Sequence, residues 1–336
     1  MPEILPKVRR VLLNRKFALS MTLFIASLNS GSNGNCYYVG NETEAVLIDA
    51  GLSCRETERR MRRLNLPLDR VKAIFVSHEH DDHIKGIEVL SHRYRLPVYV
   101  TTKTLEQCRF SPDPELARPF DAAGPITIGG LTITAFAKTH DASDPYSFTV
   151  ASPTVRIGIF TDLGHVCDNL IFHFTQCHAA FLEANYDEQL LENGRYPWPL
   201  KNRIRGGQGH LSNRQAFELF ADYRPPFMSH LLLAHLSQDN NRPELVQSLF
   251  DNAAQGTTVS IASRYNESEI YSVDGAYSGT AGPAWTPQGI RKPAVAPDKA
   301  IAPDKAAAPE HAVPAATIKH RKKLAARPQS TQIALF

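Results

Sequence analysis

Eight residues, Val76-Ser77-His78-Glu79-His80-Asp81-Asp82-His83, constrain this chain more than any other stretch. They set four metal-binding side chains in the order His-x-His-x-Asp-His, directly after the apolar run 71–76. An apolar run of this length predicts a buried strand, and strand ends in α/β proteins present side chains into a crevice. Three close histidines would lose much hydration unless a bound partner compensated them. The stretch therefore predicts a site for zinc, manganese or iron, and a solvated turn is the less favoured interpretation.

The composition excludes several classes of protein. The chain has 336 residues, of which 43% are hydrophobic, enough for a substantial core in one large or two ordinary domains. No apolar run approaches the roughly 20 residues that a membrane span needs. The five cysteines are odd in number and form no Cys-x-x-Cys pair. They indicate reduced thiols and a cytoplasmic location, not a disulfide framework or a sulfur-ligated zinc.

The distribution of charge divides the chain into three parts. Residues 1–20 carry five Lys/Arg against one acidic residue, and residues 277–336 carry nine against three, so that 21–276 carry a net −7. We expect 1–20 to be a leader; a mis-annotated start is favoured over a transit peptide, because Met21 precedes the first convincing strand. We expect 21–276 to form the folded domain. The Ala/Pro/Lys-rich residues 277–336 cannot bury enough surface to offset their chain entropy, and predict a disordered tail.

Within the predicted domain, apolar runs that read as strands alternate with amphipathic stretches. Helices are expected at 53–65, 84–94 and 213–223, and residues 194–211 read as a Gly/Arg/Lys-rich connection. Strands are expected at 23–28, 36–39, 45–49, 71–76, 97–101, 126–128, 131–137, 147–150, 155–161, 179–183 and 228–234. Polar candidates recur at the ends of these strands. An α/β fold of two packed sheets flanked by helices, a four-layer αββα sandwich, accommodates this order.

The motif at 78–83 resembles the signature of the metallo-β-lactamase superfamily in its dinuclear hydrolase form. The resemblance implies that two divalent ions, zinc or manganese, bind at the strand ends. It also implies that Asp49, which follows the strand 45–49, supports the metal-binding loop without being a ligand.

The spacing of the remaining candidates allows the ligands to be divided between two ions. His78 and His80 alternate to one side and need another histidine, for which His140 is favoured over its rival His165. Asp82 and His83 can face a second ion from a turn. Three later residues match the order of the superfamily motifs: His140 completes the first ion, Asp162 bridges, and His235 completes the second.

Two further residues predict the chemistry. In the phosphodiesterase branch of the superfamily, which includes ribonuclease Z, a His-x-(Ser/Thr) motif before the last ligand acts on the leaving group, and a glutamate orients it. Gly209-His210-Leu211-Ser212 and Glu183-Ala184 resemble these motifs. The resemblance therefore implies that His210 is a general acid and Glu183 its orienting partner, with Asp82 also serving catalysis. A structural histidine at a helix start remains the alternative for His210.

Taken together, the motifs resemble the YycJ/WalJ-like group of bacterial proteins over about residues 24–273. The group's motifs match at 27–35, 77–84, 162–166, 183–185, 209–213 and 234–237, while Tyr186 stands where a histidine is expected. The resemblance implies 5′ to 3′ exonuclease action on double-stranded DNA and a link to repair. The local basic cluster Arg195, Lys201, Arg203 and Arg205 favours a polymeric substrate.

The C-terminal residues predict a partner. Gln332-Ile333-Ala334-Leu335-Phe336 resembles the Gln-Leu-x-Leu-Phe peptide by which bacterial replication and repair proteins dock on the sliding clamp. A flexible tail would give such a peptide long reach. A hydrophobic terminus without a partner stays the alternative.

Our prediction is thus a dinuclear phosphodiesterase acting on DNA. An RNA-processing or cyclic-nucleotide phosphodiesterase on the same site is the first alternative. The second is a clamp-tethered scaffold with a vestigial metal site, which the complete ligand set argues against.

Overall fold

The computed structural model describes residues 22–275. The predictions for the leader 1–20, the tail 277–336 and the terminal peptide 332–336 lie outside these residues. Between residues 22 and 275, no helix is both long and apolar enough to cross a bilayer.

The first half of the domain and its last strand form one seven-stranded sheet, sheet A. Its strands are β14 (Tyr271–Val273), β1 (Leu23–Asn29), β2 (Cys36–Gly40), β3 (Ala45–Ile48), β4 (Val71–Phe75), β5 (Val98–Val100) and β6 (Ala117–Pro119), in that spatial order. Strands β1 to β3 pair antiparallel through hairpins, whereas β3 to β6 are parallel. The carboxyl ends of β3 and β4 therefore meet at the same edge of the sheet.

The second half repeats this plan in sheet B, also of seven strands. Its strands are β13 (Thr258–Ile261), β12 (His230–Ala234), β11 (Ala179–Glu183), β10 (Arg156–Phe160), β9 (Tyr146–Ala151), β8 (Leu131–Ala137) and β7 (Ile126–Ile128). Strands β10 to β13 are parallel, and β7 to β10 pair antiparallel. Three of the parallel strands, β10, β11 and β12, are each followed by a polar residue of the site.

The two sheets pack face to face on apolar side chains that alternate along the strands. Ile25, Val39 and Phe75 from sheet A belong to the same buried cluster as Phe148 and Phe181 from sheet B. Because successive side chains of a strand point to opposite faces, the other face of each sheet is also apolar and needs its own cover.

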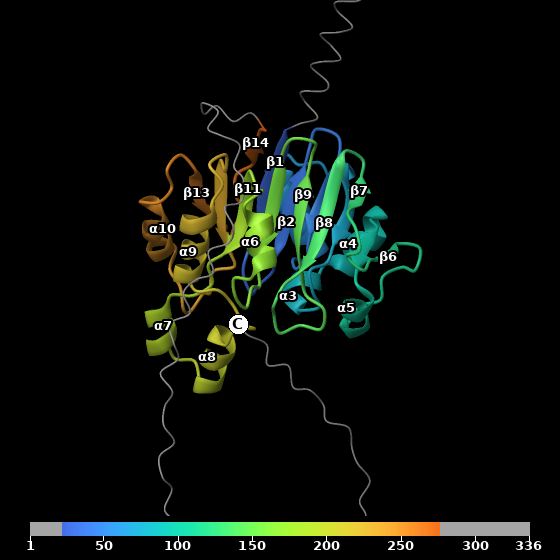
Figure 1. Cartoon of the computed structure of the whole chain (residues 1–336). Helices are drawn as coiled ribbons and strands as arrows, with labels where there is room; N and C mark the ends of the chain where they lie inside the picture. Colours follow the sequence, from blue (N-terminus) through green and yellow to red (C-terminus); the bar gives the residue numbers. More distant parts are fainter. Residues whose placement is uncertain (1–21, 276–336) are drawn as a thin grey trace, which may run out of the picture. The chain divides into compact units, whose positions relative to one another are not determined.

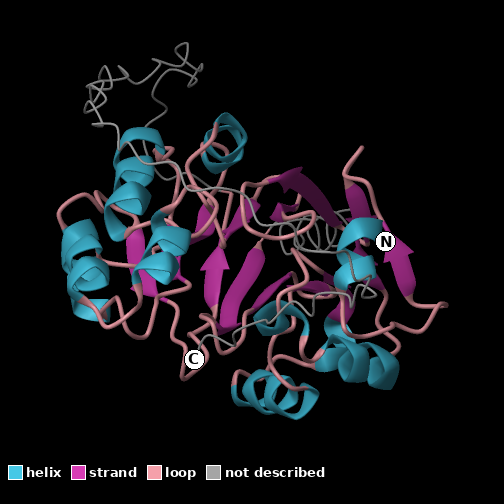
Figure 2. Cartoon of the chain, turned by 90° about the horizontal axis from the view of Figure 1, so that it is seen from below, coloured by secondary structure: helices cyan, strands magenta, loops and turns pink. Residues whose placement is uncertain are grey.

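Helices provide that cover on both outer faces. Helices α2 (Cys54–Arg63) and α4 (Ile87–Tyr94) pack on sheet A, and α6 (Asp168–Phe174), α9 (Asn213–Tyr223) and α10 (Pro243–Asp251) pack on sheet B. The shorter elements are α3 (Asp81–Ile84), α5 (Thr102–Gln107), α7 (Glu188–Asn193), α8 (Trp198–Arg205) and the 3-10 turn η1 (Leu68–Arg70). Figure 1 labels these elements, and Figure 2 shows the strands in the middle with helices on either side. The predicted αββα sandwich is confirmed.

Two expectations about helices need correction. The helix expected at 84–94 begins at Ile87, as α4, and is separated from the short helix α3, because Gly86 lies against residues 50–52; a Cβ on Gly86 would sit 1.9 Å from the Leu52 carbonyl oxygen. The connection expected at 194–211 contains the helix α8. Its Pro199, whose φ is fixed by the ring, is accommodated in the first turn, where a missing N–H costs nothing.

Candidate metal centre

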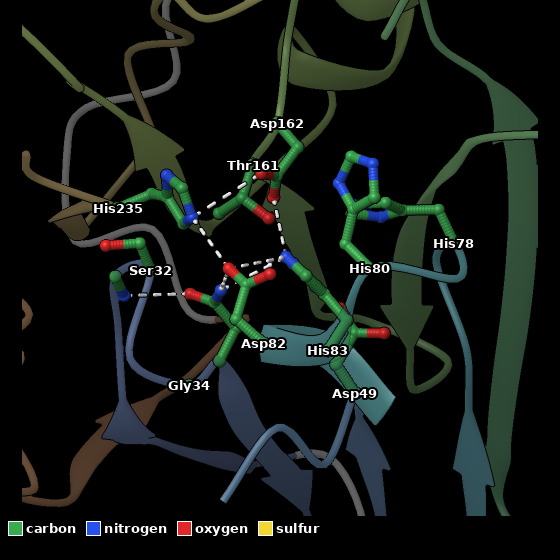
Figure 3. A network of polar contacts seen from close by, with 12 residues as sticks. Ser32, Gly34, Asp49, His78, His80, Asp82, His83, Thr161, Asp162 and His235 are labelled. Atoms are coloured by element: carbon green, nitrogen blue, oxygen red, sulfur yellow. Dashed lines mark hydrogen bonds and ion pairs between the residues drawn. The ribbon is translucent and has the colours of Figure 1, made fainter. Parts of the chain in front are cut away.

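The predicted site residues come from both sheets and meet at one end of the sandwich. Asp49 and the segment 77–83 follow β3 and β4, whereas His140, Asp162 and His235 follow β8, β10 and β12. Figure 3 shows Asp49, His78, His80, Asp82, His83, Asp162 and His235 directed toward one another. Asp82 and His83 lie on α3 and not on a turn, so the expectation of a turn is corrected.

Three of these residues have a backbone that L-amino acids seldom adopt. Asp49, Asp162 and His235 have φ of 60°, 57° and 56°. Each is the first or second residue after its strand, and the left-handed conformation turns the chain sharply there. Such a conformation costs about 1–3 kcal/mol at a non-glycine residue and persists only where the surrounding structure enforces it.

Three histidines form a first group, which we call the histidine cluster: His78, His80 and His140. One ring nitrogen of each lies within 4.8 Å of the others, and His78 Nε2 is 3.0 Å from His80 Nδ1. The His140 Nδ1–H donates to the Gly209 carbonyl at 3.0 Å, which leaves Nε2 directed at the cluster. Burial lowers the pKa of His78 and of His140 well below the usual value. These imidazoles are therefore neutral, the form that binds a metal.

Asp82, His83 and His235 form a second group, the mixed cluster. The Nε2 atoms of His83 and His235 both lie 3.5 Å from Asp82 Oδ2. Burial opposes charge on these rings, but the carboxylates of Asp162 and its neighbours prevail, raising the pKa of His83 well above its usual value and that of His235 to about 10. The surrounding carboxylates thus favour positive charge at this cluster.

Asp162 lies between the two clusters. Its Oδ2 is 3.3 Å from His83 Nε2, and its Oδ1 is 3.4 Å from His235 Nε2 and 3.9 Å from His140 Nε2. The ammonium of Lys138, which is only 8% exposed, donates to the Thr161 carbonyl at 2.7 Å and holds the peptide that precedes Asp162. No role was predicted for Lys138 from the sequence, although its position between an apolar strand and His140 could have indicated one.

A ring of hydrogen bonds directs the ligand atoms of the mixed cluster. Asp49 accepts from the Ser77 N–H and hydroxyl, both at 2.8 Å, and lies 2.7 Å from His83 Nδ1. The proton on Nδ1 therefore faces Asp49, and Nε2 faces Asp82 and Asp162. The Asn35 amide donates to Asp82 Oδ2 at 3.0 Å. No role was predicted for Asn35 or Ser77 from the sequence, although both stand beside predicted motifs.

The donor set fits divalent cations. Among residues 22–275, Nε2 of His140, Nε2 of His235 and Oδ2 of Asp162 are buried atoms that form no hydrogen bond. A buried polar atom without a partner costs roughly 1–3 kcal/mol, so three at one point indicate a ligand that satisfies them. Imidazole and carboxylate donors suit zinc or manganese.

His210 and Glu183 form a pair beside the two clusters. His210 Nδ1 lies 2.6 Å from Glu183 Oε1, and the other carboxylate oxygen accepts from the Leu163 N–H at 2.7 Å. Glu183 is fully buried at the end of β11, whereas the His210 side chain is 21% exposed. Burial opposes ionisation of Glu183, but His210 and its hydrogen bond lower the pKa of that carboxyl. The pair can hold a proton at the border between the site and solvent.

The remaining predicted residues lie around this site. Arg195 pairs with Asp239 at 2.9 Å, Arg205 with Glu192 at 2.7 Å, and Arg203 with Asp141, the neighbour of His140. Lys201 is 8% exposed and its ammonium donates to the Glu192 carbonyl, so the prediction that it contacts substrate does not fit the structure.

The structure also shows the surroundings of His165 and Tyr186, two residues whose roles the sequence left open. The exposed His165 lies 3.1 Å, through Nδ1, from the Gly207 carbonyl oxygen. Tyr186 is buried and its backbone pairs with Ser212 in an isolated bridge.

An αββα sandwich with histidine and aspartate clusters at the ends of its strands defines a metal-dependent hydrolase of the metallo-β-lactamase fold. Residues 44–235 match the family described as the beta-lactamase superfamily domain, and the chain belongs to this family. The solved metallo-beta-lactamase fold protein YhfI of Bacillus subtilis is similar in fold, with a TM-score of 0.60 and 17% identity over 75% of this chain and 99% of that one.

Two curated relatives are similar in sequence over most of their length. Exodeoxyribonuclease YycJ of Bacillus anthracis is 36% identical over 230 residues, which cover 68% of this chain and 87% of that protein. Exodeoxyribonuclease WalJ of Streptococcus pneumoniae is 31% identical over 230 residues, covering 67% and 86%. The resemblance inferred from the motifs is confirmed.

Proposed function

We propose that this protein is an exodeoxyribonuclease that hydrolyses the phosphodiester bonds of double-stranded DNA from a 5′ end, in replication or repair. The observation that carries the proposal is the His210–Glu183 pair beside Asp162, because a phosphodiester needs a proton for its departing alkoxide. The two relatives named exodeoxyribonuclease support DNA as the substrate. Free thiols at all five cysteines support a reducing compartment such as the cytoplasm.

We propose further that the histidine cluster and the mixed cluster each hold one divalent ion, with Asp162 bridging them. Such a pair of ions supplies a water of lowered pKa and stabilises both the attacking and the leaving oxygen of an in-line displacement. The residues of the chain fix where these oxygens lie. Asp49 and Gly209 orient the rings of His83 and His140, so that the displacement is aligned before the substrate arrives.

His210 completes the reaction as the general acid. Its Nδ1 is engaged by Glu183, so Nε2 is the ring nitrogen that can pass a proton to the leaving 3′ oxygen. The contact of Nδ1 with Glu183 fixes the orientation of the ring. The partial exposure of His210 lets it regain a proton from water after each turnover.

The arginines near α7 and α8 would meet the polymer. Arg195, Arg203 and Arg205 are each at least partly exposed and paired with a carboxylate. Phosphates can compete for these guanidiniums, and each phosphate contact made adds to the salt dependence of binding.

The test is His210→Ala in metal-loaded protein, with end-labelled double-stranded DNA, single-stranded DNA and RNA as substrates. We expect kcat on DNA to fall roughly 10²- to 10⁴-fold. Metal content should stay unchanged, and label should leave the 5′ end as short products in the wild type. His165→Ala is the matched control, since His165 bonds the same glycine-rich segment from its exposed side. Loss of a metal ion from His210→Ala would make His210 a ligand and refute its role as acid, whereas cleavage of RNA alone would refute DNA as the substrate.

A further inference from the structure

Helix α8 carries a large aromatic side chain on its solvent-exposed face. Trp198, the first residue of α8, is 57% exposed. The inner face of the same helix is buried through Lys201 and Ile204, and Ile204 packs with Tyr186 and Leu191. Exposure of an indole forfeits about 1.5–3 kcal/mol relative to its burial, so its position on the outer face requires another explanation.

One face of the indole is already covered by a fixed cation. The guanidinium of Arg205 lies 4.6 Å from the ring centroid of Trp198. Glu192 and the Asn202 side chain hold it there, at 2.7 and 2.9 Å. Since residues 198, 202 and 205 are spaced by four and three, they share one face of the helix. The exposed part of the indole therefore lies away from Arg205 and is available for stacking.

Helix α8 is tied to the metal centre by its C-terminal segment. The Ile204 carbonyl accepts from the His210 N–H at 2.8 Å, and the Gly209 carbonyl binds His140. Gly164 packs so closely on this segment that a Cβ there would sit 2.2 Å from the Gly207 carbonyl oxygen. Arg203 bonds to Asp141, next to His140. Figure 1 shows α7 and α8 at the same end of the domain as α3, which carries Asp82 and His83.

We propose that Trp198, backed by Arg205, is a stacking platform for an unpaired nucleobase of the substrate strand. A base inside a duplex is already stacked on both faces, whereas an unpaired base exposes its faces to a side chain, so the occupant that we propose is a single-stranded segment at the end of the DNA. An arginine on one face and a base on the other would sandwich the indole. This inference rests on the proposed function and specifies how the strand is held beside the cleavage site.

Fluorescence tests the platform without cleavage. The chain has two tryptophans, Trp198 and Trp285, so Trp285→Phe leaves Trp198 as the sole indole. Metal-loaded protein of this variant is titrated with phosphorothioate-linked oligothymidylate, which resists hydrolysis. We expect saturable quenching of the emission, because a base stacks on the ring. Unchanged emission at saturating oligonucleotide, with binding verified by anisotropy of a labelled strand, would overturn the proposal.

Kinetics give a second, independent readout. Trp198→Ala should raise KM for double-stranded DNA with a single-stranded 5′ overhang about 5- to 150-fold, the loss of one stacked base, with a small change in kcat. Trp198→Phe should restore much of the affinity. Hydrolysis of bis(4-nitrophenyl) phosphate, too small to reach the platform, should be unaffected. Phe172→Ala is the matched control, because Phe172 is an aromatic residue 62% exposed on α6. Equal KM values for wild type and Trp198→Ala would refute the platform.

The outcomes separate the two proposals. Quenching of the Trp198 emission by DNA in Trp285→Phe, together with a failure of the wild-type protein to cut DNA, would refute the exonuclease function and leave the platform standing. Cleavage of DNA without quenching would do the reverse.

Discussion

The two ligand clusters differ in what surrounds them. The rings of the histidine cluster are oriented by neutral groups, the Ser77 hydroxyl at 2.8 Å from His78 and the Gly209 carbonyl, and the carboxylate nearest to His140 Nε2 is Asp141, at 3.4 Å. The mixed cluster is built around Asp82, and its His83 is oriented by the Asp49 carboxylate.

This difference sets the charge of each cluster before any cation arrives. Burial keeps the imidazoles of His78 and His140 neutral, whereas the carboxylates near His83 and His235 stabilise the protonated rings. The histidine cluster thus presents neutral nitrogen ligands, whereas the mixed cluster pairs its rings with carboxylates. The cost of desolvating charged groups in the mixed cluster is met by close partners.

The largest effect should come from the residue that both clusters share. Asp162→Asn keeps the shape of the side chain, and asparagine tolerates the left-handed backbone at this position. Because the charged bridge is lost, we expect turnover to fall roughly 10³-fold or more, equivalent to several kcal/mol of transition-state stabilisation. Elemental analysis of the purified variant should show depletion of metal from both clusters. Full occupancy of either one would show that the clusters are independent.

A substitution at Asp49 should separate the clusters. Asp49→Asn weakens the hydrogen bond that orients His83 and touches no residue of the histidine cluster except through Ser77. We expect affinity at one of two metal-binding steps to fall about 10- to 100-fold in calorimetric titration, with the other step little changed. Asp81→Asn is the control, since this carboxylate belongs to α3 beside Asp82 but is 62% exposed. Equal weakening of both steps would contradict the separation.

The smallest effect concerns a histidine outside both clusters. His173 stacks on Phe136 with ring centroids 4.0 Å apart, and burial lowers its pKa to about 4. The unfolded chain, with a pKa near 6.5, binds this proton first as the pH falls. The stability contributed by neutral His173 is therefore complete above pH 6.5 and is lost on the way down to pH 4.

We expect His173→Phe to flatten this dependence by about 1 kcal/mol, the size allowed by the partial exposure of the ring. Urea denaturation of wild type and variant at pH 7 and pH 5 measures it. The free energy of unfolding of the variant minus that of the wild type should increase from pH 7 to pH 5. An unchanged difference would contradict the assignment.

Much of the fold followed from periodicity alone. The strands at 126–128, 131–137 and 179–183 and the helix 213–223 have the bounds that the sequence predicted. The errors have physical causes. Gly86 divides a continuous amphipathic pattern because its backbone packs on Leu52, a contact distant in sequence. Two prolines and several glycines in and around α8 obscure its helical periodicity in the sequence, so the helix was not predicted. Without the helix, Lys201 could not be assigned to a buried face.

The site could be predicted where residue type and order carry the information. The motif at 78–83 indicated metal by its density of ligands, and the order of the later motifs indicated His140, Asp162 and His235. Residue type says nothing of the left-handed backbone at Asp49, Asp162 and His235, because that conformation is imposed by the packed strands. The burial of Lys138 against the Thr161 carbonyl likewise exists only in the folded domain.

The strands that supply the site are spread over nearly the whole domain, and this has a consequence for the newly made protein. A chain released from synthesis before β12 lacks His235, and one released before β10 lacks Asp162 as well. Neither fragment assembles a complete set of ligands. A hydrolase built in this way acquires its full set of candidate ligands only once strands from both sheets are in place, so its activity depends on completion of the fold.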